Sequence, residues 1–226
     1  MMLQRVLEPE VMASHEEALD YDAMDHAAVN RSFVDDLLAE VGEHRWAETF
    51  DVLDLGTGTA QIPVELCGRN LDYRVMATDL STAMLEVAYA NINIACLNDR
   101  IVLEQEDSKG LSYDPHRFHI VMSNSIVHHV PEPWGVFSEA LRMAAPGGLV
   151  FFRDLARPDD EATVDHLVAT YAGTANARQQ KLFADSLRAA LRPEEVRDLV
   201  REFGCPPESV TATSDRHWTW IYWRPL

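Results

Sequence analysis

A short run of apolar residues leads directly into a loop of small residues that could hold a nucleotide-like ligand. Residues 51–60 read DVLDLGTGTA, with Gly56 and Gly58 two positions apart. Glycines at such positions let the backbone turn tightly and approach a ligand, and the helix that follows presents free N–H groups in its first turn. A pair of glycines alone does not identify the ligand, because several cofactors bind to loops of this kind.

Two acidic residues near the loop discriminate between the candidate cofactors. Asp79 ends the next predicted strand, where a carboxylate can hold the ribose hydroxyls of either NAD or S-adenosylmethionine. Asp54, just before the loop, would repel the pyrophosphate of NAD by roughly a kcal/mol or more in a partly desolvated site. A dinucleotide loop also favours glycine where this chain has Gln61. S-adenosylmethionine is cationic, so the charges favour it. An NAD(P)-dependent oxidoreductase and a purely structural Asp54 remain alternatives.

Four motifs in order resemble those of the class I S-adenosylmethionine-dependent methyltransferases. They read DVLDLGTGTA, ATDLS, EQEDS and VMSNSIVHHVPEP, and they span residues 50–154 together with their strands. Within that family the chain is most similar to the small-molecule group that includes the ubiquinone and menaquinone biosynthesis methylases. The resemblance implies methyl transfer by in-line displacement from S-adenosyl-L-methionine to a small molecule. A non-catalytic module that binds this cofactor is a further alternative.

The resemblance also implies which residues of the loop hold the cofactor. The methionine end would contact Asp54, Gly56, Thr57 and Gly58, and Asp79 would hold the ribose hydroxyls. In one departure from the pattern, Ala60 stands where many members have a third glycine. Alanine is small, so we expect binding to be retained.

The later motifs imply the adenine end of the site. Leu80 would pack against the adenine ring, and Asp107 would accept a hydrogen bond from its amino group, with Ser108 beside it. Asn124 would lie near the end of the fourth strand, where cofactor and acceptor meet.

The adjacent residues His128 and His129 allow three interpretations. One is a general base, because histidine titrates near neutrality, and His128 is the candidate for it. A metal pair is not favoured, because adjacent side chains are expected to diverge and no third ligand is spaced nearby. A packing role is the third interpretation. Without a third ligand nearby, the sequence predicts no metal. Methyl transfer itself needs little acid–base help, so the question of a general base stays open.

Two absences near the fourth strand limit the acceptor. The motif reads Ser-Asn-Ser-Ile rather than the Asn/Asp-Pro-Pro-aromatic motif of DNA amino methylases, and it holds no cysteine of the kind that cytosine C5 methylases use. A small molecule is therefore expected first and a protein second. The residues expected to line its pocket are Tyr21, His128, Arg153 and Tyr171.

The spacing of apolar runs predicts the elements that position these residues. Five strand candidates alternate with helical segments near 60–68, 81–97 and 133–144 and with a shorter connection near 108–116, which is typical of a parallel sheet. A helical region is expected over 9–41, ending at Gly42. The strand candidates are 51–55, 73–78, 101–105, 119–123 and 149–153.

The pattern changes after residue 154. Two or three helical segments over 157–203 predict a helical cap, and the runs 209–213 and 217–223 predict an antiparallel hairpin. The expected fold is therefore α/β, a doubly wound and mostly parallel seven-stranded sheet of Rossmann-like type. We expect one domain, 1–226, made of N-terminal helices (1–48), a cofactor-binding core (50–154), a cap (155–192) and a last helix with the hairpin (193–226).

Composition adds limits of its own. The net charge of -18 disfavours nucleic acid, because no cluster of Lys and Arg offsets it. No apolar run of membrane-spanning length and no secretory signal are found, and the three cysteines include no CxxC. We therefore expect free thiols, a cytoplasmic protein and no membrane partner. An oligomer is possible but not indicated.

Overall fold

The computed structural model describes residues 2–9, 14–24, 26–43 and 47–226. The chain forms two compact parts. The larger part comprises Val11–Asn124, Gly135–Phe151 and Tyr222–Leu226, and the smaller part comprises Met1–Glu10, Ser125–Trp134 and Phe152–Ile221. Each part contains one of the two sites described below.

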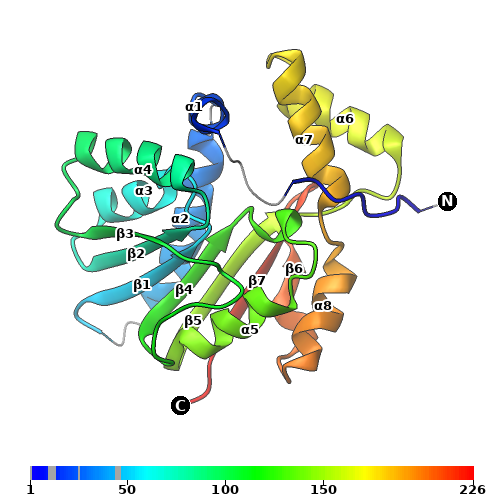
Figure 1. The fold of residues 1–226 in the computed structure, drawn as a ribbon. Coiled ribbons are helices and arrows are strands. Elements are labelled where there is room, and N and C mark those ends of the chain that lie inside the picture. The colour runs from blue at the N-terminus through cyan, green and yellow to red at the C-terminus, as the bar shows by residue number, and fades with distance from the viewer. Residues whose placement is uncertain (1, 10–13, 25, 44–46) are drawn as a thin grey trace. The chain divides into compact units, whose positions relative to one another are not determined.

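The strands form a seven-stranded sheet in the order β3-β2-β1-β4-β5-β7-β6. Strands β3, β2, β1 and β4 follow one another side by side in the larger part (Figure 1), and β5 and β7 contribute residues to both parts. The predicted α/β fold, with its mostly parallel sheet and C-terminal antiparallel pair, is confirmed. The strands are β1 (Phe50–Leu55), β2 (Tyr73–Asp79), β3 (Ile101–Gln105), β4 (Phe118–Asn124), β5 (Ala144–Leu155), β6 (Val210–Ala212) and β7 (His217–Trp223).

Helices connect most of the strands, although β3 and β4 are joined by a helix-free connection, residues 106–117. The predicted helices after β1, β2 and β4 are present, and the region between β5 and β6 holds three α-helices. The helices are α1 (His15–Asp22), α2 (Ala27–Glu43), α3 (Gln61–Arg69), α4 (Thr82–Ile94), α5 (Trp134–Met143), α6 (Glu161–Tyr171), α7 (Ala177–Ala189) and α8 (Pro193–Glu202), with short 3-10 turns η1 (Val127–His129) and η2 (Pro207–Ser209).

Strand β1 lies in the interior of the larger part. Its apolar residues Val52, Leu53 and Leu55 are fully buried, as a central strand covered on both faces requires. It pairs in parallel with β2, so that Leu55 lies opposite Thr78, and also with β4. This register brings the carboxyl ends of β1 and β2 to one edge, where the polar loops follow.

The N-terminal helical prediction is only partly correct. Residues 2–9 have no helix, and α1 begins at His15 because Ser14 and Glu17 form a capping box. Helix α2 continues to Glu43, so Gly42 does not end it as predicted. Residues 10–13 and 25 of the predicted helical range lie outside the described residues.

Strand β5 is longer than predicted. The sequence predicts this strand over residues 149–153 only. In the structure Gly147 N–H donates to Arg224 O at 3.0 Å, and Arg224 N–H donates to Gly148 O at 2.8 Å. These long-range backbone bonds let the strand continue through the glycines from Ala144.

The predicted hairpin is confirmed within the smaller part. Strands β6 and β7 pair antiparallel, with Val210 opposite Trp220 and Ala212 opposite Trp218. Both tryptophans are fully buried, and Trp220 makes an edge-on ring contact with Phe152 of β5. The hairpin is therefore held by aromatic burial as well as by its backbone ladder.

The N-terminal segment 2–9 is attached to the smaller part by its backbone. Leu3 N–H donates to Asp159 O and Val6 N–H donates to Arg188 O, at 2.8 and 3.1 Å. The Arg5 guanidinium adds donations to the carbonyls of Ala189, Val130 and Pro131. The segment thus contacts both the end of α7 and the loop that follows η1.

None of the described helices is long and apolar enough to cross a membrane. The three cysteines are free thiols, as expected: Cys67 and Cys205 are buried and Cys96 is exposed.

Candidate functional site

The loop after β1 has the backbone geometry that its glycines predict. Gly56 and Gly58 have φ angles of +69° and +56°, in the left-handed region. Ala60 adopts φ +59° as well, although alanine carries a Cβ. The position where the family pattern has a third glycine therefore needs a left-handed backbone. This chain adopts that conformation with alanine, which costs about 1–2 kcal/mol relative to glycine.

Two hydrogen bonds fix this loop against the end of β2. Thr57 N–H donates to Thr78 O, and Gly58 N–H donates to Asp79 Oδ2, both at 2.8 Å. The other carboxylate oxygen of Asp79 accepts from Ser81 N–H, at 2.8 Å. Asp79 therefore joins the glycine loop to the N-terminus of α4, and each of its oxygens has a further lone pair for a ligand.

Acidic groups surround the loop. Asp54 is buried at the end of β1, and burial together with the nearby Asp79 raises its pKa to about 7. Burial also raises the pKa of Asp79, although the N–H groups of Ser81 and Gly58 oppose the shift. A cation beside these two carboxylates would favour their ionised forms, whereas the negative charge of a pyrophosphate would disfavour them.

The residues predicted for the adenine end follow β2 and β3. Leu80 is 38% exposed, which is unusual for a leucine beside a buried strand and leaves an apolar surface for a ring. Asp107 accepts from Lys109 N–H at 2.9 Å and pairs with Lys109 Nζ at 3.0 Å. Although its partial burial opposes ionisation, these lysine contacts lower the pKa of Asp107, so it is ready to accept a hydrogen bond. Ser108 lies beside it and is partly exposed.

Asn124 supplies a test of whether a polar ligand fits this edge of the sheet. Its side-chain Oδ1 at the end of β4 is buried and, among the described residues, has no hydrogen-bond partner. A buried polar atom without a partner costs free energy unless a ligand or a water satisfies it. The orphaned Oδ1, the left-handed loop and the paired acids fit a cationic, hydrogen-bonding cofactor.

A polar network that the sequence analysis missed holds the N-terminal helices over the loop. Gln61 Nε2 donates to Asp22 Oδ1 at 2.8 Å, and Gln61 Oε1 accepts from Asn30 at 3.0 Å. Asn91 of α4 also donates to Asp22 Oδ1, and to Thr59 O of the loop itself. The only sequence signal was Gln61 in place of a glycine, which identifies the position but not its partners.

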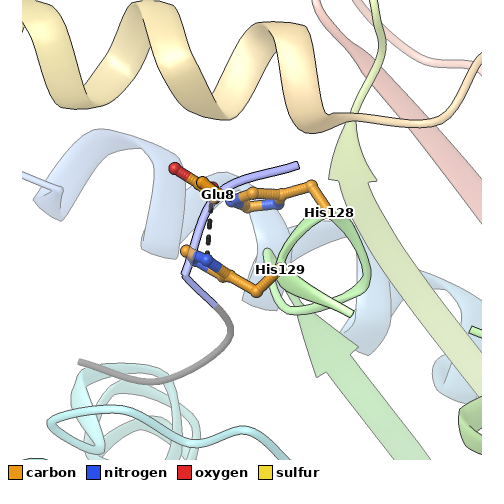
Figure 2. Close-up of side chains that lie close together, drawn as sticks. All are labelled: Glu8, His128 and His129. Carbon is orange, nitrogen blue, oxygen red and sulfur yellow. Dashed lines mark ion pairs between the residues drawn. The ribbon is translucent and has the colours of Figure 1, made fainter. Parts of the chain in front are cut away.

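The two histidines of η1 lie together rather than apart. Their ring centroids are 4.2 Å from each other, and Glu8 Oε1 lies 3.5 Å from His128 Nε2 and 3.1 Å from His129 Nδ1. Figure 2 shows the Glu8 carboxylate next to both rings. The expectation that the side chains diverge without a third group is wrong, because the turn at η1 points both rings the same way and the N-terminal segment supplies the third group.

Asp154 fixes His128 from its other side. Its Oδ1 lies 2.5 Å from His128 Nδ1, and the carboxylate also accepts from the N–H groups of Val127 and Leu155, both at 2.6 Å. Burial disfavours the His128 cation, but Asp154 and Glu8 outweigh burial and raise its pKa. Burial and the neighbouring His128 instead lower the pKa of His129 to about 3.

The residues predicted to line the pocket of the methyl acceptor have different surroundings. The ring of Tyr21 lies next to the loop, 3.9 Å from where a Cβ on Gly58 would be. Arg153 is buried in β5 and donates through Nε to Thr219 Oγ1 at 2.9 Å. Tyr171 is 46% exposed and donates to Asp215 at 2.7 Å. Arg153 and Tyr171 are both held by protein partners.

The region around the glycine loop is similar in sequence to a known protein family. Residues 53–152 match the family model described as a methyltransferase domain. This range contains the glycine loop, Asp79, Asp107 and Asn124. The match supports the resemblance to class I S-adenosylmethionine-dependent methyltransferases over this part of the chain. The domain ends inside β5, so the hairpin and the helices before it lie beyond the matched range.

Individual proteins resemble the chain over more of its length. The 27-O-demethylrifamycin SV methyltransferase of Amycolatopsis mediterranei (strain S699) is 29% identical over 72% of this chain, which spans 56% of that enzyme. The ubiquinone biosynthesis O-methyltransferase of Thiobacillus denitrificans (strain ATCC 25259 / T1) is 26% identical, over 79% of this chain and 76% of that one. The plantazolicin methyltransferase BpumL, in complex with SAH, has the same fold, with a TM-score of 0.72, 13% identity and coverage of 92% and 89%.

Proposed function

We propose that this protein transfers a methyl group from S-adenosyl-L-methionine to a small-molecule acceptor. The observation that carries the proposal is the acidic glycine loop, in which Gly58 is bonded to Asp79 and the buried Asp54 lies at the base. Acids in these positions suit a sulfonium and an ammonium, and they oppose the pyrophosphate of the NAD(P) alternative. The methyltransferase domain match covers all three residues.

At the methionine end, Asp54, Gly56, Thr57 and Gly58 would hold the cofactor. The left-handed glycines bring the backbone close to the ligand without side chains in the way. The network through Gln61 keeps the loop rigid, so that binding orders little of the chain.

At the nucleoside end, Asp79 would accept from the ribose hydroxyls through the lone pairs that Gly58 and Ser81 leave free. Leu80 would cover one face of the adenine ring, and Asp107 would accept from its amino group with Ser108 beside it. Asn124 Oδ1 would gain the partner that it lacks among the described residues.

The cofactor supplies an electrophilic methyl group whose leaving group is a neutral thioether, so no proton has to be delivered to it. The protein's contribution is to hold the acceptor in line and to exclude water. One relative is named a 27-O-demethylrifamycin SV methyltransferase and another a ubiquinone biosynthesis O-methyltransferase, which supports a small-molecule hydroxyl as acceptor. Tyr21, Arg153 and Tyr171 are the candidates to contact it.

His128 remains a candidate general base for such a hydroxyl. Asp154 would orient its ring and stabilise the imidazolium, as the carboxylate of a catalytic triad does. Its Nε2 faces Glu8, however, so the base role requires Glu8 to move away. A metal ion bound to the same Nε2 atom would exclude this role.

We further expect a cytoplasmic protein that binds neither nucleic acid nor membrane. The charge of -18 supports the first exclusion. The free cysteines are consistent with a reducing compartment.

Turnover of labelled methyl groups tests the proposal. The protein is incubated with S-adenosylmethionine labelled in its methyl group and a fractionated metabolite extract, and label is followed into extractable products. We expect transfer to one chemical class of product and none with Asp79→Ala. Absence of transfer, with S-adenosylhomocysteine still bound, would instead favour the non-catalytic module.

A thermal unfolding experiment separates the dehydrogenase alternative. We expect S-adenosylhomocysteine to raise the melting temperature and NADH to leave it unchanged. Protection by NADH alone would overturn the cofactor assignment.

A further inference from the structure

The cluster of Glu8, His128 and His129 has the donor set of a transition-metal site. Two imidazole nitrogens and one carboxylate oxygen all lie within 4.8 Å of one another. Two of the separations are 3.1 and 3.5 Å, both to Glu8 Oε1. Ligand atoms around a tetrahedral zinc ion, at bond lengths of about 2.0–2.2 Å, are roughly 3.3 Å apart, so the cluster needs only a small contraction to bind one.

The tautomer of His128 is the one that a metal requires. Asp154 can only accept from Nδ1 at 2.5 Å, so in the neutral ring Nδ1 carries the proton and Nε2 presents its lone pair toward Glu8. Metal-bound histidines commonly donate their other N–H to a carboxylate in this manner. Asp154 in turn accepts hydrogen bonds from two backbone N–H groups, and metal sites commonly have such an outer support, meaning groups that hold the ligands without touching the metal.

His129 presents an atom without a partner to the same point. Its Nδ1 is buried and 3.1 Å from Glu8 Oε1, but it makes no hydrogen bond with that oxygen or with another of the described residues. A lone pair facing a carboxylate oxygen is unfavourable unless a cation or a proton lies between them. Figure 2 shows both imidazoles directed at the single carboxylate.

Glu8 is held in place even though it comes from the distant N-terminal segment. The hydroxyl oxygen of Ser186 in α7 lies 3.1 and 3.3 Å from the two carboxylate oxygens of Glu8. The Glu8 side chain is only 9% exposed. The carboxylate is therefore positioned before a metal arrives, and the ion would connect segment 2–9 to η1.

We propose that Glu8, His128 and His129 bind one divalent transition-metal ion, with Zn²⁺ as the best-fitting occupant. Imidazole nitrogen together with carboxylate oxygen suits zinc, whereas Mg²⁺ and Ca²⁺ prefer sites made of oxygen alone. Three protein ligands leave a fourth tetrahedral position open. The proposal depends on none of the cofactor residues, so it is independent of cofactor binding and excludes only the general-base role of His128.

Metal titration tests the site directly. Tag-free protein in a Cys96→Ser background, which removes the one cysteine that is exposed, is stripped with a chelator and dialysed. It is then titrated with ZnCl₂ by calorimetry, and bound metal is measured after equilibrium dialysis. We expect one zinc per chain and no comparable binding of Mg²⁺. Failure to bind zinc stoichiometrically would overturn the site.

Matched variants locate the ion. We expect Zn²⁺ affinity to fall at least about tenfold in His129→Ala and in Glu8→Gln. The control is His166→Ala, which removes an exposed histidine of α6 from the same part of the chain, and we expect its zinc affinity to be unchanged. Equal affinities in His129→Ala and His166→Ala would overturn the assignment.

The outer support is tested with Asp154→Asn. Loss of the carboxylate should weaken zinc binding by about 10- to 100-fold without changing the number of ions bound. Because Asp154 is buried, its variant is first shown to melt cooperatively without zinc, and if it does not fold, the His129 comparison decides. A folded Asp154→Asn protein with unchanged zinc affinity would contradict the carboxylate–histidine–metal arrangement.

Discussion

The glycine loop and the histidine cluster both follow strands of the same sheet, but they are built differently. The loop depends on backbone geometry and on neighbours one strand away, as in the bond from Gly58 to Asp79. The cluster depends on Glu8, which is separated from His128 by more than a hundred residues. One site is therefore specified locally, and the other exists only where the N-terminal segment is attached.

This difference predicts that cofactor binding and the histidine cluster can be disrupted separately. We expect Asp79→Ala to weaken binding of S-adenosylhomocysteine by about 100-fold, because ribose loses its charged acceptor and Gly58 loses its partner. His128→Ala should change that affinity by less than about threefold. Calorimetric titration with S-adenosylhomocysteine measures both.

Melting curves of the two variants provide the control for folding. Unchanged affinity in Asp79→Ala would remove the ribose assignment. An equally large loss in both variants would show that the two sites are not separable, and the comparison would fail.

The pH dependence of cofactor binding sharpens the charge argument for the loop. Burial raises the pKa of Asp54 to about 7, so a proton competes with a cationic ligand below that pH. An acid with a raised pKa is ionised only above it, so affinity for S-adenosylmethionine should rise with pH. We expect about a tenfold gain between pH 5.5 and pH 7.

Asp54→Asn is the matched variant, because its amide does not titrate. Its affinity should be lower and independent of pH over the same range. A pH profile that is as steep in Asp54→Asn as in the natural protein would show that another group controls binding.

Arg5→Ala tests the attachment on which the cluster depends. The guanidinium bonds to the carbonyls of Ala189, Val130 and Pro131 hold the N-terminal segment. Their loss, at about 1.5–3 kcal/mol, should raise amide exchange at Val6 by about 10- to 100-fold, measured by mass spectrometry. Cofactor affinity should not change.

The exposed neighbour Gln4 supplies the control, since Gln4→Ala removes a side chain of the same segment that makes only a marginal local contact. Exchange at Val6 should be unaffected in that variant. Equal exchange in both variants would mean that the backbone bond of Val6, rather than Arg5, holds the segment.

The same contrast explains which features were predictable from sequence. The strands and the loop were predictable because apolar runs and glycines report local conformation directly. Strand β5 was predicted too short, because its first residues are extended only by bonding to Arg224 near the other end of the chain. The prediction that the helix ends at Gly42 was wrong as well, because α2 continues to Glu43 and glycine within a helix is only a weak stop signal.

Within the two sites, the residues that could not be predicted from sequence were again those brought together by long-range contacts. The acids at the loop could be identified because strand ends meet at one edge of a parallel sheet. The convergence of Glu8 with His128 and His129 could not, because no spacing in the sequence relates residue 8 to residue 128. The network through Gln61 could not be predicted either. Gln61 bonds to Asn30 and Asp22 of two other helices, and Asn91 of a third helix bonds to Asp22.

The smallest expected effect concerns the one loop position that departs from the family pattern. Ala60 is held at φ +59°, which glycine adopts without strain, so Ala60→Gly should relieve about 1 kcal/mol. Its methyl group is fully buried, and losing that contact offsets part of the gain. We expect a net rise in the free energy of unfolding of about 0.5 kcal/mol, measured by urea denaturation, with cofactor affinity retained.

Ala90, an exposed alanine inside α4, gives the matched control. Ala90→Gly should lower the free energy of unfolding by about 1 kcal/mol, because glycine destabilises a helix interior. The same substitution then has opposite signs at the two positions, which only the local backbone conformation explains. If Ala60→Gly were as destabilising as Ala90→Gly, packing of the buried methyl group rather than backbone strain would control that position, and the loop would depend on its surroundings as the histidine cluster does.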